Sequence, residues 1–220
     1  MFSHVKIDVP NKLKRVTIDG KRYYEIPGEE NVKLVSVTTV TSFQSIESIK
    51  KWRARVGEKA ANAKSKRATS RGTDMHTLVE DYLNNQDLSK VQPLSELLFK
   101  IAKPKLNNID KIHALETPLY SRKLGIAGTV DCIAEYNGEL AVIDFKTSEK
   151  PKPEKWIEGY FVQAVAYACM LYELTGIKVK KLVIIMSCEN GECVVYEKYN
   201  KSEYITKLAQ YIREWKSANE

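Results

Sequence analysis

The stretch that decides the fold runs over residues 128–146 and reads GTVDCIAEYNGELAVIDFK. At its centre, Asn137-Gly138 separates two runs in which apolar residues alternate with others. That combination is typical of a β-hairpin closed by a two-residue type I′ turn. Such a turn makes Tyr136 face Glu139, and this first pair sets the register of the whole hairpin.

In this register two acidic side chains meet across the hairpin. Asp131 faces Asp144, Thr129 faces Lys146, and facing Cβ atoms lie about 4.5–5.5 Å apart on one side of the sheet. Because side chains alternate, Lys146 shares the face of Asp144. The two carboxylates repel one another unless a divalent cation lies between them. The alternative is a structural Asp–Lys–Asp cluster on a wet face, and a β-bulge would break the register.

The surrounding pattern predicts an α/β fold of α+β type, in which helices flank a mixed central sheet. Residues 3–27 have the pattern of short strands with turns at Pro10-Asn11 and Asp19-Gly20, and residues 45–105 that of helices broken at Gly57 and Gly72. We expect strands at 111–121, 127–136, 139–148, 181–188 and 192–199, and helices at 154–175 and 202–217. We predict one domain over residues 1–220, with a hairpin and helical part at 1–109 and a core at 110–220.

Composition excludes several classes of protein. Of the 220 residues, 43% are hydrophobic, so general disorder is not expected. No apolar run approaches the ~18 residues of a membrane span, and residues 1–12 lack the pattern of a signal or transit peptide. We therefore expect a soluble protein without a membrane partner. The four cysteines form no C-x-x-C pair, so we expect free thiols rather than a zinc site.

The formal net charge is +7, which favours a polyanionic partner. Residues 50–71 contain nine basic residues and one acid, Glu58. Within them, Lys64, Lys66 and Arg67 are candidates for contacts with DNA phosphates. A solvated helical face is the other interpretation of the same stretch.

Four short motifs, taken in order, carry a family resemblance. They are Arg71-Gly-Thr-x-x-His76, Gly128-Thr-Val-Asp131, Val142-Ile-Asp144-Phe-Lys146 and Gln163-x-x-x-Tyr167. Together they resemble the RecB-type branch of the PD-(D/E)XK nucleases over roughly residues 35–200. Residues 36–39, Trp52 and Gly57 are similar to the N-terminal part of phage exonucleases and of the mitochondrial genome maintenance exonuclease. This chain has Val-Asp in place of Pro-Asp, and no cysteine before Cys132 for the iron–sulfur cluster of some relatives.

The resemblance implies a restriction-endonuclease-like core and a set of roles. It implies Mg²⁺, with Mn²⁺ as a substitute, bound by His76, Asp131, Asp144, the carbonyl of Phe145 and Glu116. It also implies Asp131, Asp144 and Lys146 as catalytic residues. Gln163 and Tyr167 would line the active-site groove, and Arg71 and Thr38 would contact DNA.

The residues themselves support these roles unevenly. His76 lies at the edge of the apolar stripe of its helix, where a packing role and a ligand role both fit, with Glu80 as a possible partner. Glu116 lies in a strand whose register no tight turn sets. On the helix predicted at 154–175, Trp156, Tyr160, Gln163 and Tyr167 form a second stripe, which either packs on other helices or stacks bases.

Together these observations predict a metal-dependent DNA exonuclease that prefers single-stranded ends. The alternatives are a structure-selective endonuclease of branched DNA and a non-catalytic DNA-binding module on the same fold. No G-x-x-x-x-G-K-[ST] motif is present, so unwinding would need a partner such as a replication or recombination protein. On resemblance we expect the cytoplasm of a bacterium or of a phage-infected cell.

Overall fold

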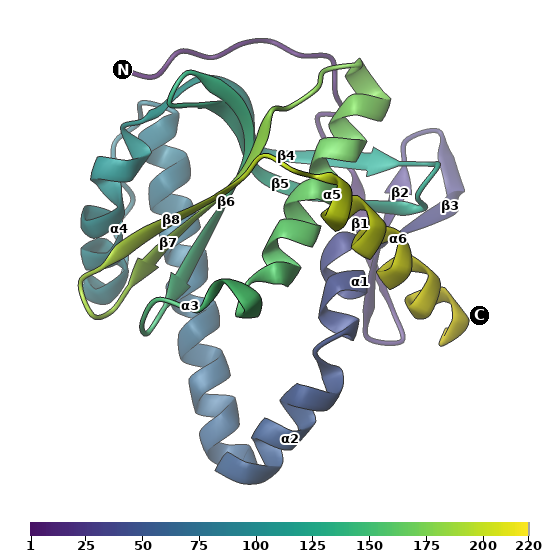
Figure 1. Ribbon diagram of the computed structural model, residues 1–220, viewed down its shortest axis with the longest axis horizontal. Helices are drawn as coiled ribbons and strands as arrows, with labels where there is room; N and C mark the ends of the chain where they lie inside the picture. The colour runs from purple at the N-terminus through teal and green to yellow at the C-terminus, as the bar shows by residue number, and fades with distance from the viewer. Residues whose placement is uncertain (220) are drawn as a thin grey trace.

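The computed structural model describes residues 1–219 and builds them around one mixed β-sheet (Figure 1). Within these residues the sheet has eight strands: seven follow the order β1-β2-β3-β5-β6-β7-β8, and the eighth, β4, pairs with β5. The strands are β1 Lys14–Ile18, β2 Lys21–Ile26, β3 Glu29–Ser36, β4 Ile109–Ser121, β5 Ile126–Tyr136, β6 Glu139–Ser148, β7 Lys181–Cys188 and β8 Cys193–Lys198. The helices are α1 Val37–Phe43, α2 Ile46–Val56, α3 Glu58–Leu83, α4 Pro93–Leu106, the 3₁₀ helix η1 Glu154–Trp156, α5 Glu158–Thr175 and α6 Ser202–Ser217.

The strands expected after residue 110 are confirmed to within two residues at each end, and α6 is confirmed at both ends. Two expectations for the helices were wrong. Gly72 lies inside α3 and does not break it, because an interior glycine costs a helix only about 1 kcal/mol. Residues 154–156 form a separate turn after Pro153, so Trp156 does not lie on α5 with Tyr160.

The N-terminal strands were also only partly anticipated. The Asp19-Gly20 turn joins β1 to β2, with positive φ at both residues. The segment before β1 contains an isolated bridge between His4 and Ile112 and no strand, so Pro10-Asn11 is not a hairpin turn. β3 pairs with β5 through Val35 and Ser36, so the first 109 residues contribute strands to the same sheet as the core.

Helices cover both faces of the sheet (Figure 1). Helices α3 and α4 pack on one face, where Met75, Leu78 and Phe99 contact the core side chains of β6 and β7. Helices α1, α5 and α6 pack on the other face, and α5 is buried almost all round in its middle turns. Residues on both faces of the central strands are therefore buried, and their strands are apolar runs rather than clean alternations.

Strand β5 has an interrupted edge. Along one side it pairs with β4 over most of its length. Along the other side it pairs with β3 at residues 126–127 and with β6 at residues 132–136. Residues 128–131 lie between these two segments and pair with neither β3 nor β6. Beyond the pair Cys132↔Ile143, β5 and β6 no longer pair with each other. There β5 remains paired with β4, and β6 remains paired with β7 as far as Ser148. We call this divergence of β5 and β6 the fork.

Helix α2 and the first turns of α3 project from the body of the molecule (Figure 1). Helix α2 has no buried residue, and between Glu58 and Arg67 only Ala61 is buried. We call residues 46–67 the basic arm, since most of the basic stretch found in the sequence lies there and is exposed. Across residues 1–219 no helix has the length and apolar character needed to span a membrane. The cysteines Cys132, Cys169, Cys188 and Cys193 are free thiols, as expected.

Candidate active site

The register predicted from the Asn137-Gly138 turn is confirmed over five pairs, from Tyr136↔Glu139 to Cys132↔Ile143. Asp131 and Asp144 are the next residues outward, and there the pairing of β5 with β6 ends. The expected pair of Thr129 with Lys146 is therefore wrong, because the strands have already parted. In place of a backbone bond, Asp131 Oδ2 accepts the Phe145 N–H at 3.0 Å. The fork thus brings the two carboxylates together at its apex.

Lys146 lies beside Asp144, as the alternation of side chains predicted. Its Nζ is 2.6 Å from each oxygen of the Asp144 carboxylate. Oδ1 accepts a hydrogen bond from it, whereas Oδ2 is buried and has no hydrogen bond. Burial raises the pKa of Asp144 to about 6, an effect that the charge of Lys146 opposes and that of Asp131 reinforces. Burial lowers the pKa of Lys146, but the charges of Asp144 and Asp131 outweigh it and raise that pKa.

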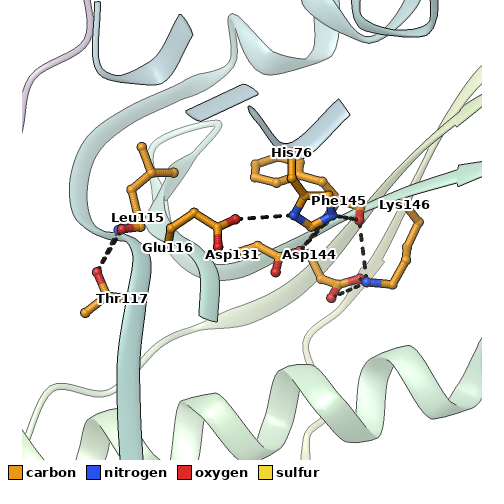
Figure 2. A network of polar contacts seen from close by, with 8 residues as sticks. All are labelled: His76, Leu115, Glu116, Thr117, Asp131, Asp144, Phe145 and Lys146. Carbon is orange, nitrogen blue, oxygen red and sulfur yellow. Dashed lines mark hydrogen bonds and ion pairs between the residues drawn. The ribbon is translucent and has the colours of Figure 1, made fainter. Parts of the chain in front are cut away.

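Glu116 reaches the fork from β4 through a distorted backbone (Figure 2). It lies between the pairs Leu115↔Cys132 and Thr117↔Val130 and has a φ of 44°. The hydroxyl of Thr117 accepts the Leu115 N–H at 3.1 Å and lies 3.0 Å from the Leu115 carbonyl, to which it can donate. A non-glycine residue keeps a positive φ only where its surroundings stabilise that conformation. Here the contacts of Thr117 with the Leu115 backbone stabilise the conformation of Glu116.

His76 reaches the same place from helix α3 (Figure 2). Its Nδ1 is 3.3 Å from Glu116 Oε1, and its Nε2 is 3.0 Å from the Phe145 carbonyl and 3.8 Å from Asp131 Oδ2. The partner on the Nδ1 side is thus Glu116 rather than Glu80. Burial lowers the pKa of His76, but the charge of Asp131 and the Glu116 hydrogen bond outweigh it and raise the pKa to about 9. The acceptors at both nitrogens favour the imidazolium, so binding of a cation at His76 would require one ring nitrogen to give up its proton.

These side chains make a donor set that fits a hard divalent cation. One ligand atom from each of His76, Glu116 and Asp131 lies within 4.8 Å of the others. The Phe145 carbonyl lies beside this cluster at 3.0 Å from His76 Nε2, and Asp144, whose buried Oδ2 is paired with the Lys146 ammonium at 2.6 Å, is a further potential ligand. Carboxylate and carbonyl oxygens are the ligands that Mg²⁺ prefers. Three of the five residues singled out in the sequence as ligands thus form one cluster, with Asp144 and the Phe145 carbonyl next to it.

The residues expected to contact DNA are distributed more widely. Tyr167 is buried, with its hydroxyl against Gly128 and near Gln163. Arg71 is also buried: its Nε donates to Thr147 Oγ1 at 3.0 Å and its Nη1 pairs with Glu189.

Three of the expected DNA contacts lie outside the fork. Thr38 lies in the first turn of α1, where its hydroxyl is 2.8 Å from that of Ser36. Lys64 and Arg67 are exposed on the basic arm, and Arg67 pairs with Glu189 at 2.6 Å.

Thr117 was not identified from the sequence. It holds Leu115 on the far side of Glu116, in the segment Leu-Glu-Thr-Pro. A hydroxyl residue directly before a proline and directly after an isolated acid in an apolar strand is the signal that could have indicated it.

The chain is similar to several known proteins. The sequence profile of the PD-(D/E)XK nuclease superfamily matches residues 94–219. The mitochondrial genome maintenance exonuclease 1 of Homo sapiens is 32% identical over 181 residues, which cover 76% of this chain and 50% of that protein. One component of an ATP-dependent helicase/nuclease from Clostridium kluyveri is 42% identical over 59 residues, 27% of this chain and 5% of that protein. A crystal structure from Eubacterium rectale aligns with a TM-score of 0.46 and 13% identity, over 66% of this chain and 64% of that one. This chain thus spans about half the length of the human relative.

Proposed function

This chain belongs to the PD-(D/E)XK nuclease superfamily, and on that basis we propose that it is a metal-dependent exonuclease that hydrolyses phosphodiester bonds at the ends of single-stranded DNA. One observation carries the proposal. At the apex of the fork, potential ligand atoms of His76, Glu116 and Asp131 lie within 4.8 Å of one another, and the ion pair of Asp144 with Lys146 lies beside them. Residues 1–220 would act as one nuclease domain, with residues 110–220 as its core.

In this proposal His76, Glu116, Asp131, Asp144 and the Phe145 carbonyl hold Mg²⁺, or Mn²⁺ in its place. Such an ion, when bound, supplies a Lewis acid for the phosphate and for the attacking water. Asp131 also fixes the Phe145 backbone through the 3.0 Å bond to its N–H, which aims the neighbouring carbonyl at His76. The side chains that bind the ion therefore position one another.

Lys146 would supply the positive charge nearest to the reacting phosphate. Asp144 anchors its Nζ at 2.6 Å, and the Tyr160 ring lies 5.1 Å away on the α5 side. With one donor given to Asp144 and a second, at 3.5 Å, to the Phe145 carbonyl, the ammonium keeps one N–H to offer to a phosphate oxygen or to the attacking water. A side chain so anchored loses little entropy when the substrate arrives, which favours a role in the transition state.

Two observations support DNA as the substrate: the positive charge of the chain and its similarity to known nucleases. The chain carries a formal net charge of +7, and its basic arm is exposed. Its relatives include proteins named as an exonuclease and as part of a helicase/nuclease. We extend both names to this chain as part of the proposal, together with replication or recombination proteins as partners. In a bacterial or phage-infected cell such a protein would process DNA ends in the cytoplasm.

The test is digestion of linear single-stranded, linear duplex and closed circular DNA, each linear form labelled in turn at its 5′ and 3′ ends. We expect mononucleotides or short products from the labelled ends of single strands in Mg²⁺ or Mn²⁺, and none from circles. Cleavage of circles, or of branched junctions in preference to ends, would replace the exonuclease by an endonuclease. Full activity in excess chelator would refute the metal dependence.

A further inference from the structure

A pocket of about 650 Å³ lies beside the fork, where it is lined by the end of β6 and the residues that follow. The loop between β6 and η1 forms one wall and residues of α3 form the other. Its lining includes Arg71, Glu149, Lys150, Lys152, Trp156 and Tyr160. Of these, Arg71 and Tyr160 already have a place in the site described above: Arg71 is paired with Glu189, and the Tyr160 ring lies beside Lys146.

The pocket is connected to the catalytic lysine through one aromatic ring. Lys146 Nζ lies 5.1 Å from the centre of the Tyr160 ring, and Lys152 Nζ lies 5.4 Å from the same centre. Lys152 also donates to the Tyr160 hydroxyl at 3.0 Å, and its own carbonyl accepts the Tyr196 hydroxyl at 2.7 Å. Both the ammonium and the backbone carbonyl of Lys152 are therefore held by hydrogen bonds. The Tyr160 ring separates Lys146 from the pocket.

Trp156 is the most unusual side chain of this pocket. It is 67% exposed, although an indole is large and mostly apolar. The 3₁₀ turn that carries it follows Pro151 and Pro153, whose rings restrict the backbone of the loop. A rigid segment thus presents a flat aromatic face to solvent within a pocket that also offers the ammonium groups of Lys150 and Lys152, against one acid, Glu149.

A flat apolar surface next to ammonium groups matches the two parts of a nucleotide, a base that stacks and a phosphate that carries charge. We propose that this pocket binds one unpaired nucleotide of the DNA strand, immediately next to the phosphate that Lys146 acts on. Its base stacks on Trp156 and its phosphate contacts Lys150 and Lys152. This inference rests on the proposed function and deepens it, because a base within a duplex has no free face for the indole. The pocket thereby selects single strands.

The first test is equilibrium binding of a fluorescent single-stranded oligonucleotide in calcium, with the variants Trp156→Ala and Trp156→Phe. Tyr172→Ala is the matched control, because Tyr172 is a 51% exposed aromatic residue near the other end of the neighbouring helix α5. We expect Trp156→Ala to weaken binding about 5- to 150-fold, the loss associated with one base–aromatic stack. Trp156→Phe should restore most of it, and Tyr172→Ala should bind like the wild type. Equal binding by Trp156→Ala and Tyr172→Ala would overturn the inference.

A second measurement uses the DNA rather than the protein. An abasic position is moved one nucleotide at a time from the end of the oligonucleotide. At one position it should weaken binding by the wild type as much as Trp156→Ala does, and it should have no further effect on that variant. Additive losses at every position would overturn the inference. Cleavage of the same oligonucleotides separates the two proposals: an inactive wild type that shows this Trp156 dependence refutes the nuclease alone, and an active wild type without it refutes the pocket alone.

Discussion

Gly128 lies directly against Tyr167: a Cβ at residue 128 would fall 2.8 Å from the phenol oxygen and 3.1 Å from Cε1. The φ of Gly128 is not positive, so its backbone does not require glycine. The requirement is space, since the unpaired edge of β5 passes under a buried tyrosine of α5. This contact joins the Gly128-Thr-Val-Asp131 motif to the Gln163-x-x-x-Tyr167 motif, three residues from Asp131.

Gly128→Ala should therefore destabilise the protein by about 1–3 kcal/mol, the usual cost of overpacking a core. The double variant Gly128→Ala, Tyr167→Phe should recover part of this loss, because it removes the nearest atom. Gly159→Ala is the control, since a Cβ at Gly159 meets nothing within 4 Å and the residue lies in α5. The measurement is the urea midpoint of unfolding. A urea midpoint of Gly128→Ala equal to that of Gly159→Ala would contradict the prediction, because it would mean that the Tyr167 side chain moves aside at no cost in stability.

Thr117 should act on the metal through Glu116. Thr117→Val removes both contacts with the Leu115 backbone, so the left-handed conformation of Glu116 loses its support. Losing such an outer contact typically costs about 10–100-fold in metal affinity. We expect a loss of that size for Mn²⁺ by calorimetry, with little change in DNA binding, and recovery in Thr117→Ser. Unchanged Mn²⁺ affinity in Thr117→Val would mean that the rest of β4 holds Glu116 in place.

His76→Ala should raise the metal concentration needed for half-maximal cleavage and leave the fold intact. The imidazole is half-buried at the edge of the apolar stripe of α3, and its nitrogens face Glu116, Asp131 and the Phe145 carbonyl, while its ring meets one core side chain, Phe145, edge-on with ring centres 6.3 Å apart. His113→Ala is the matched control, because His113 lies on β4, three residues from Glu116, and its Nδ1 has no hydrogen-bond partner. The measurement is the cleavage rate across a Mg²⁺ titration beside thermal unfolding. Superimposable titrations for both variants would make His76 a structural residue.

The parts of the site that the sequence predicted are those that depend on contacts between residues close together in the chain. A two-residue turn determines the pairing of its own strands, so Asn137-Gly138 was enough to bring Asp131 to Asp144. It could not show that the strands part at that point, because the fork depends on β3 and β7, which pair with β5 and β6 from distant parts of the chain. The role of Glu116 was inferred only from the family resemblance, because a residue with a distorted backbone does not follow the alternating pattern of its strand. Arg71 was expected to bind DNA, yet it is buried against Glu189, 118 residues away, and no local pattern indicates such a partner.

The basic arm should account for part of the salt dependence of DNA binding. Lys64, Lys66 and Arg67 are exposed on a helix segment that projects from the sheet (Figure 1). Each phosphate contact adds about 0.7 to the slope of log affinity against log salt for single strands. Replacing all three by alanine should lower the slope by about 2, or somewhat less because Glu189 already pairs with Arg67. Alanine at Lys123, Lys178 and Lys180 makes the same change in charge elsewhere and should leave most of the slope intact. Equal slopes for the two triple variants would make the arm an ordinary solvated face.

Lys146→Ala should separate chemistry from binding. The ammonium is anchored on Asp144 and lies next to the Tyr160 ring, with its side chain only 21% exposed. Its removal deletes one positioned charge, for which a loss of about 10²–10⁴ in rate is typical. Single-turnover cleavage should therefore slow at least about a hundredfold, while binding isotherms in calcium stay close to those of the wild type. Lys180→Ala, which removes an exposed lysine outside the fork, should cut normally.

Lys146→Arg should not restore the rate of Lys146→Ala. A guanidinium is planar, bulkier and effectively never deprotonated, so it cannot place one point charge between Asp144 and the Tyr160 ring. Near wild-type cleavage by Lys146→Ala would remove Lys146 from the active site altogether. Equal losses of binding and cleavage would make it an anchor for the phosphate. In that case the group that acts in the transition state must be sought among the remaining side chains of the fork, with Asp144, which would have lost its ammonium partner, as the first to test.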